Sequence, residues 1–336
     1  MIIDGKEIKG GLPPYCIAEI SCNHGGLLDN AFSLIDAARY AGADAVKFQA
    51  YTPDTLTLDC HKPDFIIQDG LWKGRNLYDL YAKAHTPFEW FPKLFEHAKE
   101  VGITIFASVF DRTSVDMLRR LDCPAYKIAS MEIGDIPLVK YAAMSNKPMI
   151  ISTGMADLND IKAAFEACEE TNVAFLHCTS EYPGTVEWAD LARMLVIKVL
   201  LAGADALVGV SDHTSSPALV PIAATALGAN IIEKHLKLED VDTEDREFSL
   251  TPQDFRIMVR ATKMAHEAVR LRDFASNPSR QLKRSLYAVA DIKKGELFSE
   301  DNIRSIRPGY GLSPKHLPRL LGKKADQNYR KGDRIT

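Results

Sequence analysis

The chain has 336 residues, a formal net charge of −4, a hydrophobic share of 46% and a charged share of 26%. These values are ordinary for a soluble globular protein and leave room for one large domain with an appendage. Lys and Arg form no clustered block, which argues against nucleic acid as the main partner, because phosphate binding needs concentrated positive charge.

Six cysteines occur without a CxxC pair, and most of them lie in apolar runs. We therefore expect reduced core residues of a cytoplasmic protein rather than a disulfide framework. The N-terminus, MIIDGKEIKG, has no apolar segment typical of a signal peptide. No apolar stretch reaches the ~20 residues that span a bilayer, so no membrane partner is expected.

Short apolar runs alternate with helical patterns along most of the chain. The runs are continuous rather than alternating, as expected for parallel strands that are buried on both faces. The expected strands are 15–20, 44–49, 103–109, 125–130, 148–153, 173–179, 206–213 and 230–236.

Amphipathic helices are expected between and after these strands. One of them places Pro87 at its first helical position and ends before Gly102. Thr251 and Pro252 open the last helix with an N-cap followed by proline. The expected helices are 30–41, 87–101, 112–121, 137–145, 158–171, 187–203, 217–227 and 252–270.

Eight strand–helix repeats predict a closed (β/α)8 barrel, the TIM-barrel architecture, over residues 1–270. A doubly wound sheet is the alternative, weakened because GLPPYCIAEISCNHGG lacks the GxGxxG pattern. The unusually long connection 50–86 is rich in polar and aromatic residues, such as Trp72, that suit a sugar. Residues 271–283 are predicted to be a linker, and 284–336 a small β-rich domain.

Polar residues gather where the expected strands end, which is where active sites lie in barrels of this type. Nearly every strand contributes to this set. In chain order it contains Glu19, Asn23, His24, Lys47, Gln49, Ser108, Lys127, Ser130, Glu132, Ser152, Thr153, His177, Thr179, Ser180, Ser211, Asp212, His213, Glu233, Lys234 and His235.

Two histidines of this set, His213 and His235, end consecutive strands. Adjacent strands lie about 5 Å apart, so both imidazoles can reach one metal ion. Imidazole and carboxylate ligands suit manganese, zinc or iron. The alternative is a pair of buried, hydrogen-bonded histidines without a metal.

Three lysines, Lys47, Lys127 and Lys234, are expected in or near the barrel mouth. Their charges repel unless an anion is bound, and a ligand with phosphate and carboxylate groups, such as phosphoenolpyruvate, would satisfy them. Structural ion pairs with nearby glutamates are one alternative. Another is Schiff-base chemistry, which uses a buried lysine at a strand end.

Hydroxyl side chains at the strand ends can donate hydrogen bonds to a phosphate or a carboxylate. A nucleophilic serine is not expected, because no GxSxG motif is present. For each hydroxyl the alternative is a satisfied loop cap. These residues are Ser130, Ser152, Thr153, Thr179 and Ser211.

The chain resembles the sialic acid synthases, over almost its whole length and in the expected order, in the motifs AEISCNHGG, AGADAVKFQ, PMIISTGM, LHCTSEYP, VGVSDHT and IRPGYG. That family joins a phosphoenolpyruvate-condensing barrel to a C-terminal antifreeze-like (SAF) domain. Within it, YTPDTLTLDC and GLWKGRNLYDLY are most similar to the pseudaminic acid synthases, which use 2,4-diacetamido-2,4,6-trideoxy-L-altrose rather than N-acetylmannosamine.

The resemblance also implies roles for individual residues. His213 and His235 would hold a divalent metal, typically manganese, magnesium or cobalt, with Glu19 near the reacting centre. Gln49, Tyr182 and Asp245 would face the sugar. The residues that would surround phosphoenolpyruvate are Lys47, Ser108, Lys127, Ser130, Ser152, Thr153 and Ser211.

The implied reaction joins phosphoenolpyruvate, the trideoxy hexose and water to give pseudaminic acid and phosphate. Glu19 and Glu132 are the candidates for positioning water or moving protons. Arg307 is expected to reach the partner's barrel in a domain-swapped homodimer and to contact the sugar's N-acyl group. The loop LEDVDTEDREFSL, which contains Asp245, is more acidic and less glycine-rich than the usual family form.

Three other functions stay open at this point. One is an N-acetylneuraminate or legionaminate synthase that uses N-acetylmannosamine or a related hexose. The second is an aldolase that forms a Schiff base on a lysine with pyruvate. The third is a carbohydrate-binding protein without enzymatic activity, which the antifreeze-like domain suggests.

Overall fold

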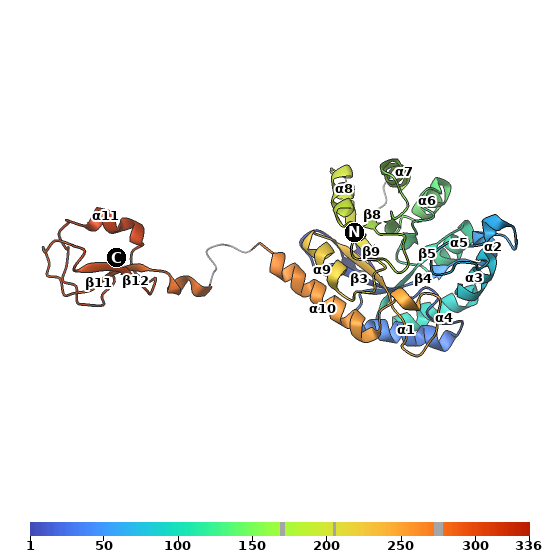
Figure 1. Ribbon diagram of the computed structural model, residues 1–336, viewed down its shortest axis with the longest axis horizontal. Helices are drawn as coiled ribbons and strands as arrows, with labels where there is room; N and C mark the ends of the chain where they lie inside the picture. Colours follow the sequence, from blue (N-terminus) through green and yellow to red (C-terminus); the bar gives the residue numbers. More distant parts are fainter. Residues whose placement is uncertain (169–171, 204–205, 272–277) are drawn as a thin grey trace. The chain divides into compact units, whose positions relative to one another are not determined.

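The computed structural model describes residues 1–336 apart from 169–171, 204–205 and 272–277. The chain divides into two compact units, Met1–Arg270 and Leu271–Thr336 (Figure 1). The linker expected at 271–283 lies partly outside the described residues, and so does the end of the helix expected at 158–171.

The first unit is built on a closed barrel of parallel strands, which confirms the predicted (β/α)8 fold. The order around the barrel follows the chain, and β10 pairs with β3 to close it. Its strands are β3 (Tyr15–Glu19), β4 (Ala45–Ala50), β5 (Thr104–Val109), β6 (Tyr126–Ile128), β7 (Met149–Ser152), β8 (Val173–His177), β9 (Leu207–Asp212) and β10 (Ile231–His235).

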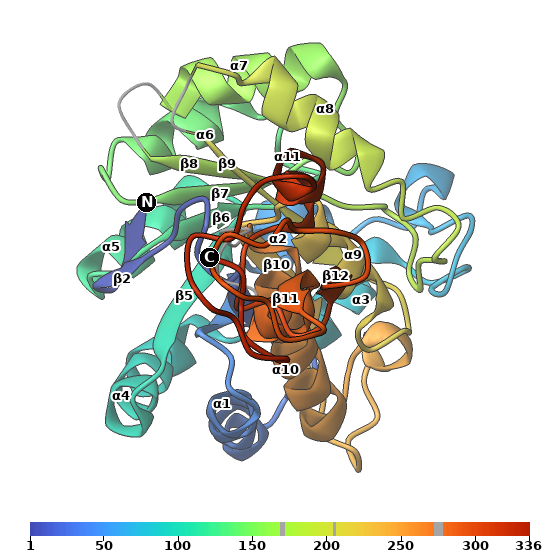
Figure 2. The same cartoon turned by 90° about the vertical axis from the view of Figure 1, so that its left-hand side faces the viewer.

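Burial explains the continuous apolar runs of these strands. Every residue of β3, β8 and β10 is buried, because one face of each strand lines the barrel interior and the other packs against the surrounding helices. Helices ring the strands in both views of this unit (Figures 1 and 2).

The main helices of this unit are α1 (Leu28–Ala41), α3 (Leu77–Ala84), α4 (Phe91–Val101), α5 (Arg112–Arg120), α6 (Ile136–Ala143), α7 (Leu158–Cys168), α8 (Ala192–Leu200), α9 (Leu219–Ala226) and α10 (Pro252–Val269). The predicted cap of α10 is present, because the Thr251 side chain accepts a hydrogen bond from the backbone of Asp254. The helix predicted to start at Pro87 begins later, at Phe91, after the 3-10 helix η2 (Phe88–Trp90). Pro92 stands in the first turn of α4, where a missing N–H costs nothing.

Two long connections follow the carboxyl ends of β4 and β10. The first follows β4; we call its residues 51–86 the insert, which contains α2 (Pro53–Leu56), η1 (Pro63–Phe65) and α3. The second joins β10 to α10 through η3 (Arg246–Phe248). We call it the β10–α10 loop, residues 236–251.

The second unit has a small core of its own. Its strands β11 (Ser285–Ala288) and β12 (Ile303–Ile306) pair antiparallel and pack with buried residues such as Phe298 and Tyr329. Its short helices are η5 (Pro278–Leu282), η6 (Pro314–His316) and α11 (Leu317–Leu320). At the start of the chain, β1 (Ile2–Ile3) and β2 (Lys6–Glu7) form an antiparallel pair.

All six cysteines are free, as the sequence predicts, and five of them are buried. None of the described helices combines the length and the apolar character that a membrane crossing requires.

Candidate active site

One cavity opens among the carboxyl ends of the barrel strands, and most of the predicted site residues line it. Seven barrel strands contribute side chains to it: β3 to β7, β9 and β10. The loops that follow β6, β8 and β9 contribute the rest. We call it the central cavity; it is lined by Glu19, Lys47, Gln49, Ser108, Lys127, Ala129, Ser130, Met131, Ser152, Cys178, Tyr182, Ser211, His213, Glu233 and His235.

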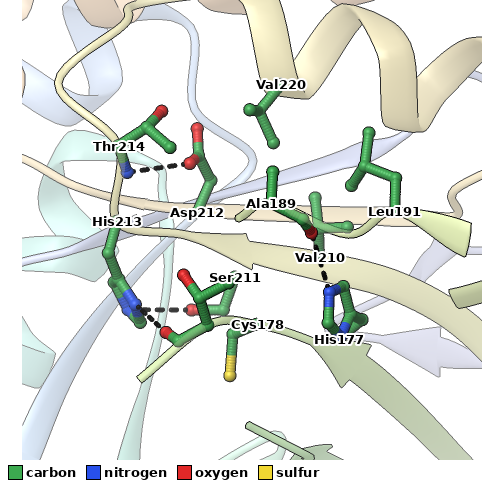
Figure 3. A pocket seen from close by; sticks show the side chains of 11 residues that line it. His177, Cys178, Ala189, Leu191, Val210, Ser211, Asp212, His213, Thr214 and Val220 are labelled. Carbon is green, nitrogen blue, oxygen red and sulfur yellow. Dashed lines mark hydrogen bonds between the residues drawn. The ribbon is translucent and has the colours of Figure 1, made fainter. Parts of the chain in front are cut away.

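Strand alternation decides which side chains face this cavity. Ser211 and His213 both face it, whereas Asp212 points the other way, toward the backbone of Thr214 (Figure 3). Glu233 and His235 face it from the next strand.

Lys234 does not take part in the cavity, which corrects the prediction that it lies at the mouth as an anion-binding residue. It is fully buried, and its Nζ donates to Asp212 Oδ2 and to the carbonyl of Thr214, both at 2.6 Å. The residue lies between two cavity-facing neighbours on β10, so alternation turns it outward. The buried Asp212–Lys234 pair therefore links the ends of β9 and β10, the strands that carry His213 and His235.

Lys47 lies at the centre of a buried charge cluster. Its Nζ is 2.5 Å from Glu19 Oε2 and 3.7 Å from Glu233 Oε1, and it donates to Ser108 Oγ at 2.9 Å. Burial acts to lower the pKa of Lys47, but the two carboxylates raise it above its ordinary value. Burial raises the pKa of Glu19, although Lys47 opposes the shift. Lys47 is therefore held as a cation that already has a partner.

Lys127 has a different environment. Its Nζ donates to Ser152 Oγ at 2.6 Å and to the carbonyl of Ile128 at 2.9 Å, and no described carboxylate lies within ion-pair distance. Burial lowers the pKa of Lys127 below its ordinary value. A buried ammonium without a carboxylate partner favours an anionic ligand, because the ligand charge offsets the cost of burial.

The two histidines lie side by side, with ring centroids 5.5 Å apart. His213 Nδ1 lies 3.0 Å from the carbonyl of Thr179. A carbonyl can only accept, so Nδ1 carries the proton and Nε2 carries the lone pair. Burial lowers the pKa of both imidazoles, and for His235 the proximity of His213 adds to the shift. Both rings are thus neutral, the form that binds a metal.

Aromatic rings close one side of the central cavity. The ring of Tyr182 lies 4.3 Å from that of His213 and 5.1 Å from that of Phe248, measured between centroids. Phe248 in turn lies 4.9 Å from the ring of His235. Trp72, from the insert, lies 5.8 Å from Tyr182. This wall combines apolar ring faces with the hydroxyl of Tyr182, so it can contact both apolar and polar groups of a ligand.

Two further predicted residues lie near the cavity without lining it. Asp245 is buried, with Oδ2 3.5 Å from His235 Nδ1, and burial raises its pKa to about 6. The carboxyl of Glu132 has a buried Oε2 without a hydrogen-bond partner among the described residues. Burial raises the pKa of Glu132 to about 7, because the nearby charge of Lys127 offsets only part of the desolvation.

One predicted residue, Thr153, is not brought to this cavity, and another, Arg307, belongs to the second unit. Thr153 follows the inward-facing Ser152 and so points outward: its hydroxyl donates to the carbonyl of Leu176, and it lines a groove between α7 and α8 with His177. This geometry does not fit its predicted role in binding substrate. Arg307 is exposed and belongs to the second unit, so its role stays a prediction.

Glu233 and Cys178 line the cavity but were given no role from the sequence, although Glu233 was among the polar residues expected at the strand ends. Glu233 Oε1 accepts from Ser211 Oγ at 2.9 Å, and its Oε2 has no described hydrogen-bond partner. Burial acts to raise the pKa of Glu233, but Lys47 and Lys127 lower it below its ordinary value. Alternation was the signal that could have found it, because residues two apart on a strand share a face and His235 was already placed there.

Comparison with known proteins agrees with this architecture. Residues 34–272 match the NeuB family, and residues 283–336 match the SAF domain. The pseudaminic acid synthase of Campylobacter jejuni subsp. jejuni serotype O:2 is 45% identical over 96% of this chain and 95% of its own length. The pseudaminic acid synthase of Helicobacter pylori is 40% identical over 94% of each chain.

A solved structure is also similar to this chain over its whole length. The spore coat polysaccharide biosynthesis protein spsE of Bacillus subtilis aligns with a TM-score of 0.69 and 32% identity, covering 100% of this chain and 97% of its own. The similarity thus extends over both units of the chain. On this basis, the chain belongs to the NeuB family and carries a SAF domain at its C-terminal end.

Proposed function

We propose that the chain is a pseudaminic acid synthase, which joins phosphoenolpyruvate, 2,4-diacetamido-2,4,6-trideoxy-L-altrose and water to give pseudaminic acid and phosphate. The observation that carries the proposal is its 45% identity to a pseudaminic acid synthase over 96% of the chain. The central cavity supports it independently. Buried lysines and hydroxyls suit a phosphate-bearing anion, and an aromatic wall beside them suits a sugar.

We further propose a divalent metal ion, manganese before magnesium or cobalt, held by His213 and His235. The donor set fits such an ion: both imidazoles are neutral, and the His213 tautomer leaves Nε2 free to bind. Glu233 Oε2 and His235 Nδ1 are buried atoms without described hydrogen-bond partners nearby. When bound, the ion would supply Lewis-acid polarisation of the sugar aldehyde.

In the proposed reaction, Lys47 and Lys127 bind the anionic groups of phosphoenolpyruvate. Hydroxyls that already contact these lysines, Ser108 and Ser152, can donate to the ligand's oxygens after a small rotation. These groups are fixed on strands, so they stabilise negative charge without reorganising during the reaction. Carbon 3 of phosphoenolpyruvate then attacks the sugar aldehyde, and a new carbon–carbon bond forms.

Water completes the proposed reaction by adding to carbon 2, after which the carbon–oxygen bond to phosphate breaks. The aldehyde oxygen gains one proton, and the attacking water loses one. Glu132 is suited to the proton transfer because its pKa, raised to about 7 by burial, lies near neutral pH. Glu19 accepts from Gln49 at 2.9 Å and so can orient water or sugar at the same place.

A substrate panel tests the proposal. Purified protein with manganese and phosphoenolpyruvate is supplied with the trideoxy hexose or with N-acetylmannosamine, and the nine-carbon product is measured by mass spectrometry. We expect kcat/KM to favour the trideoxy hexose by about 10-fold or more, which is about 1.4 kcal/mol of transition-state binding. Equal or better turnover of N-acetylmannosamine would contradict the proposal and favour a neuraminate synthase.

The lysine-dependent aldolase remains a competing function, because burial lowers the pKa of Lys127 and a neutral amine is the form that attacks a carbonyl. The two reactions differ in their products. The synthase releases phosphate from phosphoenolpyruvate and is inactive with pyruvate. An aldolase uses pyruvate and is trapped covalently on Lys127 by borohydride, which mass spectrometry of the peptide would detect.

A further inference from the structure

The insert and the β10–α10 loop meet beside the central cavity, but they are not closely packed there. A second cavity of about 340 Å³ separates them, lined by Leu71, Trp72, Arg75, Lys83, Asp242, Thr243, Glu244, Arg246 and Glu247. Open volume of this size limits the van der Waals contact between the two segments here. The rings of Trp72 and Phe248 still meet edge to face, with centroids 6.4 Å apart. Polar contacts must therefore supply much of the connection.

These polar contacts converge on one residue, Glu244 of the β10–α10 loop. Its Oε1 is 2.7 Å from Lys83 Nζ, and its Oε2 accepts from Arg75 Nη1. Its backbone carbonyl accepts from the indole N–H of Trp72 at 3.3 Å. Burial acts to raise the pKa of Glu244, but the hydrogen bonds from Lys83 and Arg75 lower it below its ordinary value. Glu244 therefore stays ionised at neutral pH.

The three partners come from two different pieces of the insert. Lys83 lies on α3, whereas Trp72 and Arg75 lie in a turn that is tied at its base by backbone hydrogen bonds between Ile67 and Arg75 and between Gly74 and Ile67. A single carboxylate thus fixes both the helix and the turn. Glu247 makes no comparable contact to the insert: it is exposed on the same loop and has no ion pair or hydrogen bond among the described residues.

Glu244 is also joined through the backbone to a residue near the central cavity. The next residue, Asp245, is buried with Oδ2 3.5 Å from His235 Nδ1. On the other side of the contact, the ring of Trp72 lies 5.8 Å from that of Tyr182, which lines the central cavity. A shift of the Glu244 carboxylate would therefore move two walls of the same end of the site.

We propose that Glu244 is a positioning residue: its clamp on Arg75 and Lys83 ties the insert to the β10–α10 loop and fixes Trp72 and Asp245 around the sugar. This inference rests on the proposed function, because that function places the sugar at this end. The phosphoenolpyruvate end does not depend on the clamp. Lys47, Lys127 and their hydroxyl partners are held by the barrel strands themselves.

The test compares Glu244→Gln with Glu247→Gln, which removes the same charge from the same loop. For Glu244→Gln we expect the KM for the sugar to rise about 10-fold, since displacement of a binding wall by a fraction of an ångström is costly. The KM for phosphoenolpyruvate should stay within about twofold, because its groups are strand-borne. Glu247→Gln should match the wild-type protein in both values.

Hydrogen exchange of the ligand-free protein gives a readout that does not need turnover. Amides of residues 66–76 should exchange faster in Glu244→Gln, whereas amides of the barrel strands keep their protection. The double variant Arg75→Gln/Lys83→Gln should reproduce both effects, and adding Glu244→Gln to it should change little more. The side chains of Arg75 and Lys83 are both partly exposed, so the double variant is expected to fold.

The proposal is overturned if Glu244→Gln matches Glu247→Gln in sugar KM and in the exchange of residues 66–76. It is also overturned if the KM values for both substrates rise equally, which would indicate a general disturbance of the barrel. The kinetic comparison uses whichever amino hexose the wild-type protein turns over. Failure of the trideoxy hexose as a substrate would thus contradict the proposed function. The hydrogen-exchange data would still test whether Glu244 ties the insert to the β10–α10 loop.

Discussion

At the scale of single residues, the carboxyl groups around the central cavity differ because their neighbours differ. Glu233 lies near two lysines, which keep it ionised. Glu132 instead has a buried Oε2 without a hydrogen-bond partner among the described residues, and desolvation raises its pKa to about 7. The same amino acid therefore provides a fixed negative charge at one position and a proton-transfer group at the other.

The raised pKa of Glu132 predicts a pH-dependent stability. The folded protein holds this proton up to about pH 7, whereas the unfolded chain releases it near its ordinary value of 4.5. The unfolded state thus binds fewer protons between these values, and the contribution of Glu132 to stability falls as the pH rises through this window. Glu132→Gln should remove this loss, which amounts to about 1–3 kcal/mol between pH 4.5 and 8.

The measurement is thermal unfolding of both proteins at pH 5 and pH 8. Glu132→Gln should be stabilised relative to the wild-type protein at pH 8 and much less so at pH 5. The same relative stability at both pH values would show that the carboxyl titrates normally in the folded state.

The neutral imidazoles predict that His213 is needed for metal binding. His213→Ala should weaken Mn²⁺ binding by more than about 100-fold, since loss of an outer partner alone costs up to that much. Isothermal titration calorimetry measures this directly. His177→Gln is the control, because Nε2 of that ring is hydrogen-bonded to the carbonyl of Ala189 (Figure 3). The ring lines the α7–α8 groove and does not line the central cavity. Full activity of His213→Ala after exhaustive chelation would remove the metal from the mechanism.

At the scale of elements, the neighbouring strands β9 and β10 bring His213 and His235 together. Their contact is unusually close at Gly209: a Cβ on this residue would lie 2.2 Å from the carbonyl oxygen of Ile231. The absence of a side chain is therefore what allows the backbones to approach here. The buried Asp212–Lys234 pair ties the same two strands at their carboxyl ends.

Gly209→Ala should therefore destabilise the protein by about 1–3 kcal/mol, because the added methyl group forces β9 away from β10. Chemical or thermal unfolding checks this value, and Mn²⁺ affinity should fall with it as the histidines separate. Gly10→Ala is the matched control, since its Cβ would meet no atom within 4 Å and its φ is not left-handed. Equal stability of Gly209→Ala and Gly10→Ala would show that the protein does not need the close contact of β9 and β10 at Gly209.

At the scale of the whole molecule, the chain joins a barrel that contains the central cavity to a small unit with its own core. Arg307 is exposed in that second unit, and its planar guanidinium suits the carbonyl of an N-acyl group better than lysine would. A small core gains stability by docking on a larger surface, and a two-fold exchange closes such an assembly symmetrically. We therefore propose a domain-swapped homodimer in which Arg307 completes the site of the partner subunit.

Mixing two inactive variants tests this assembly. Arg307→Ala and His213→Ala proteins, unfolded and refolded together, should regain part of the activity, because each mixed dimer contains one intact composite site. Each variant refolded alone is the control. Mixed dimers that form, as shown by differential tagging, but stay as inactive as their parents would show that Arg307 does not act in trans.

The sequence by itself determined the barrel, its strands and most of the cavity residues. Continuous apolar runs that alternate with amphipathic helices fit a parallel sheet covered by helices, and eight such repeats favour a closed barrel. Polar residues at the ends of the runs then meet at one rim. Ser152 and His213 were found in this way. Only the tertiary structure decided which polar neighbour faces inward, because alternation separates Ser152 from Thr153 and His235 from Lys234. It alone also revealed Glu244, whose partners Arg75 and Lys83 lie more than 150 residues away along the chain and meet it only in the folded protein.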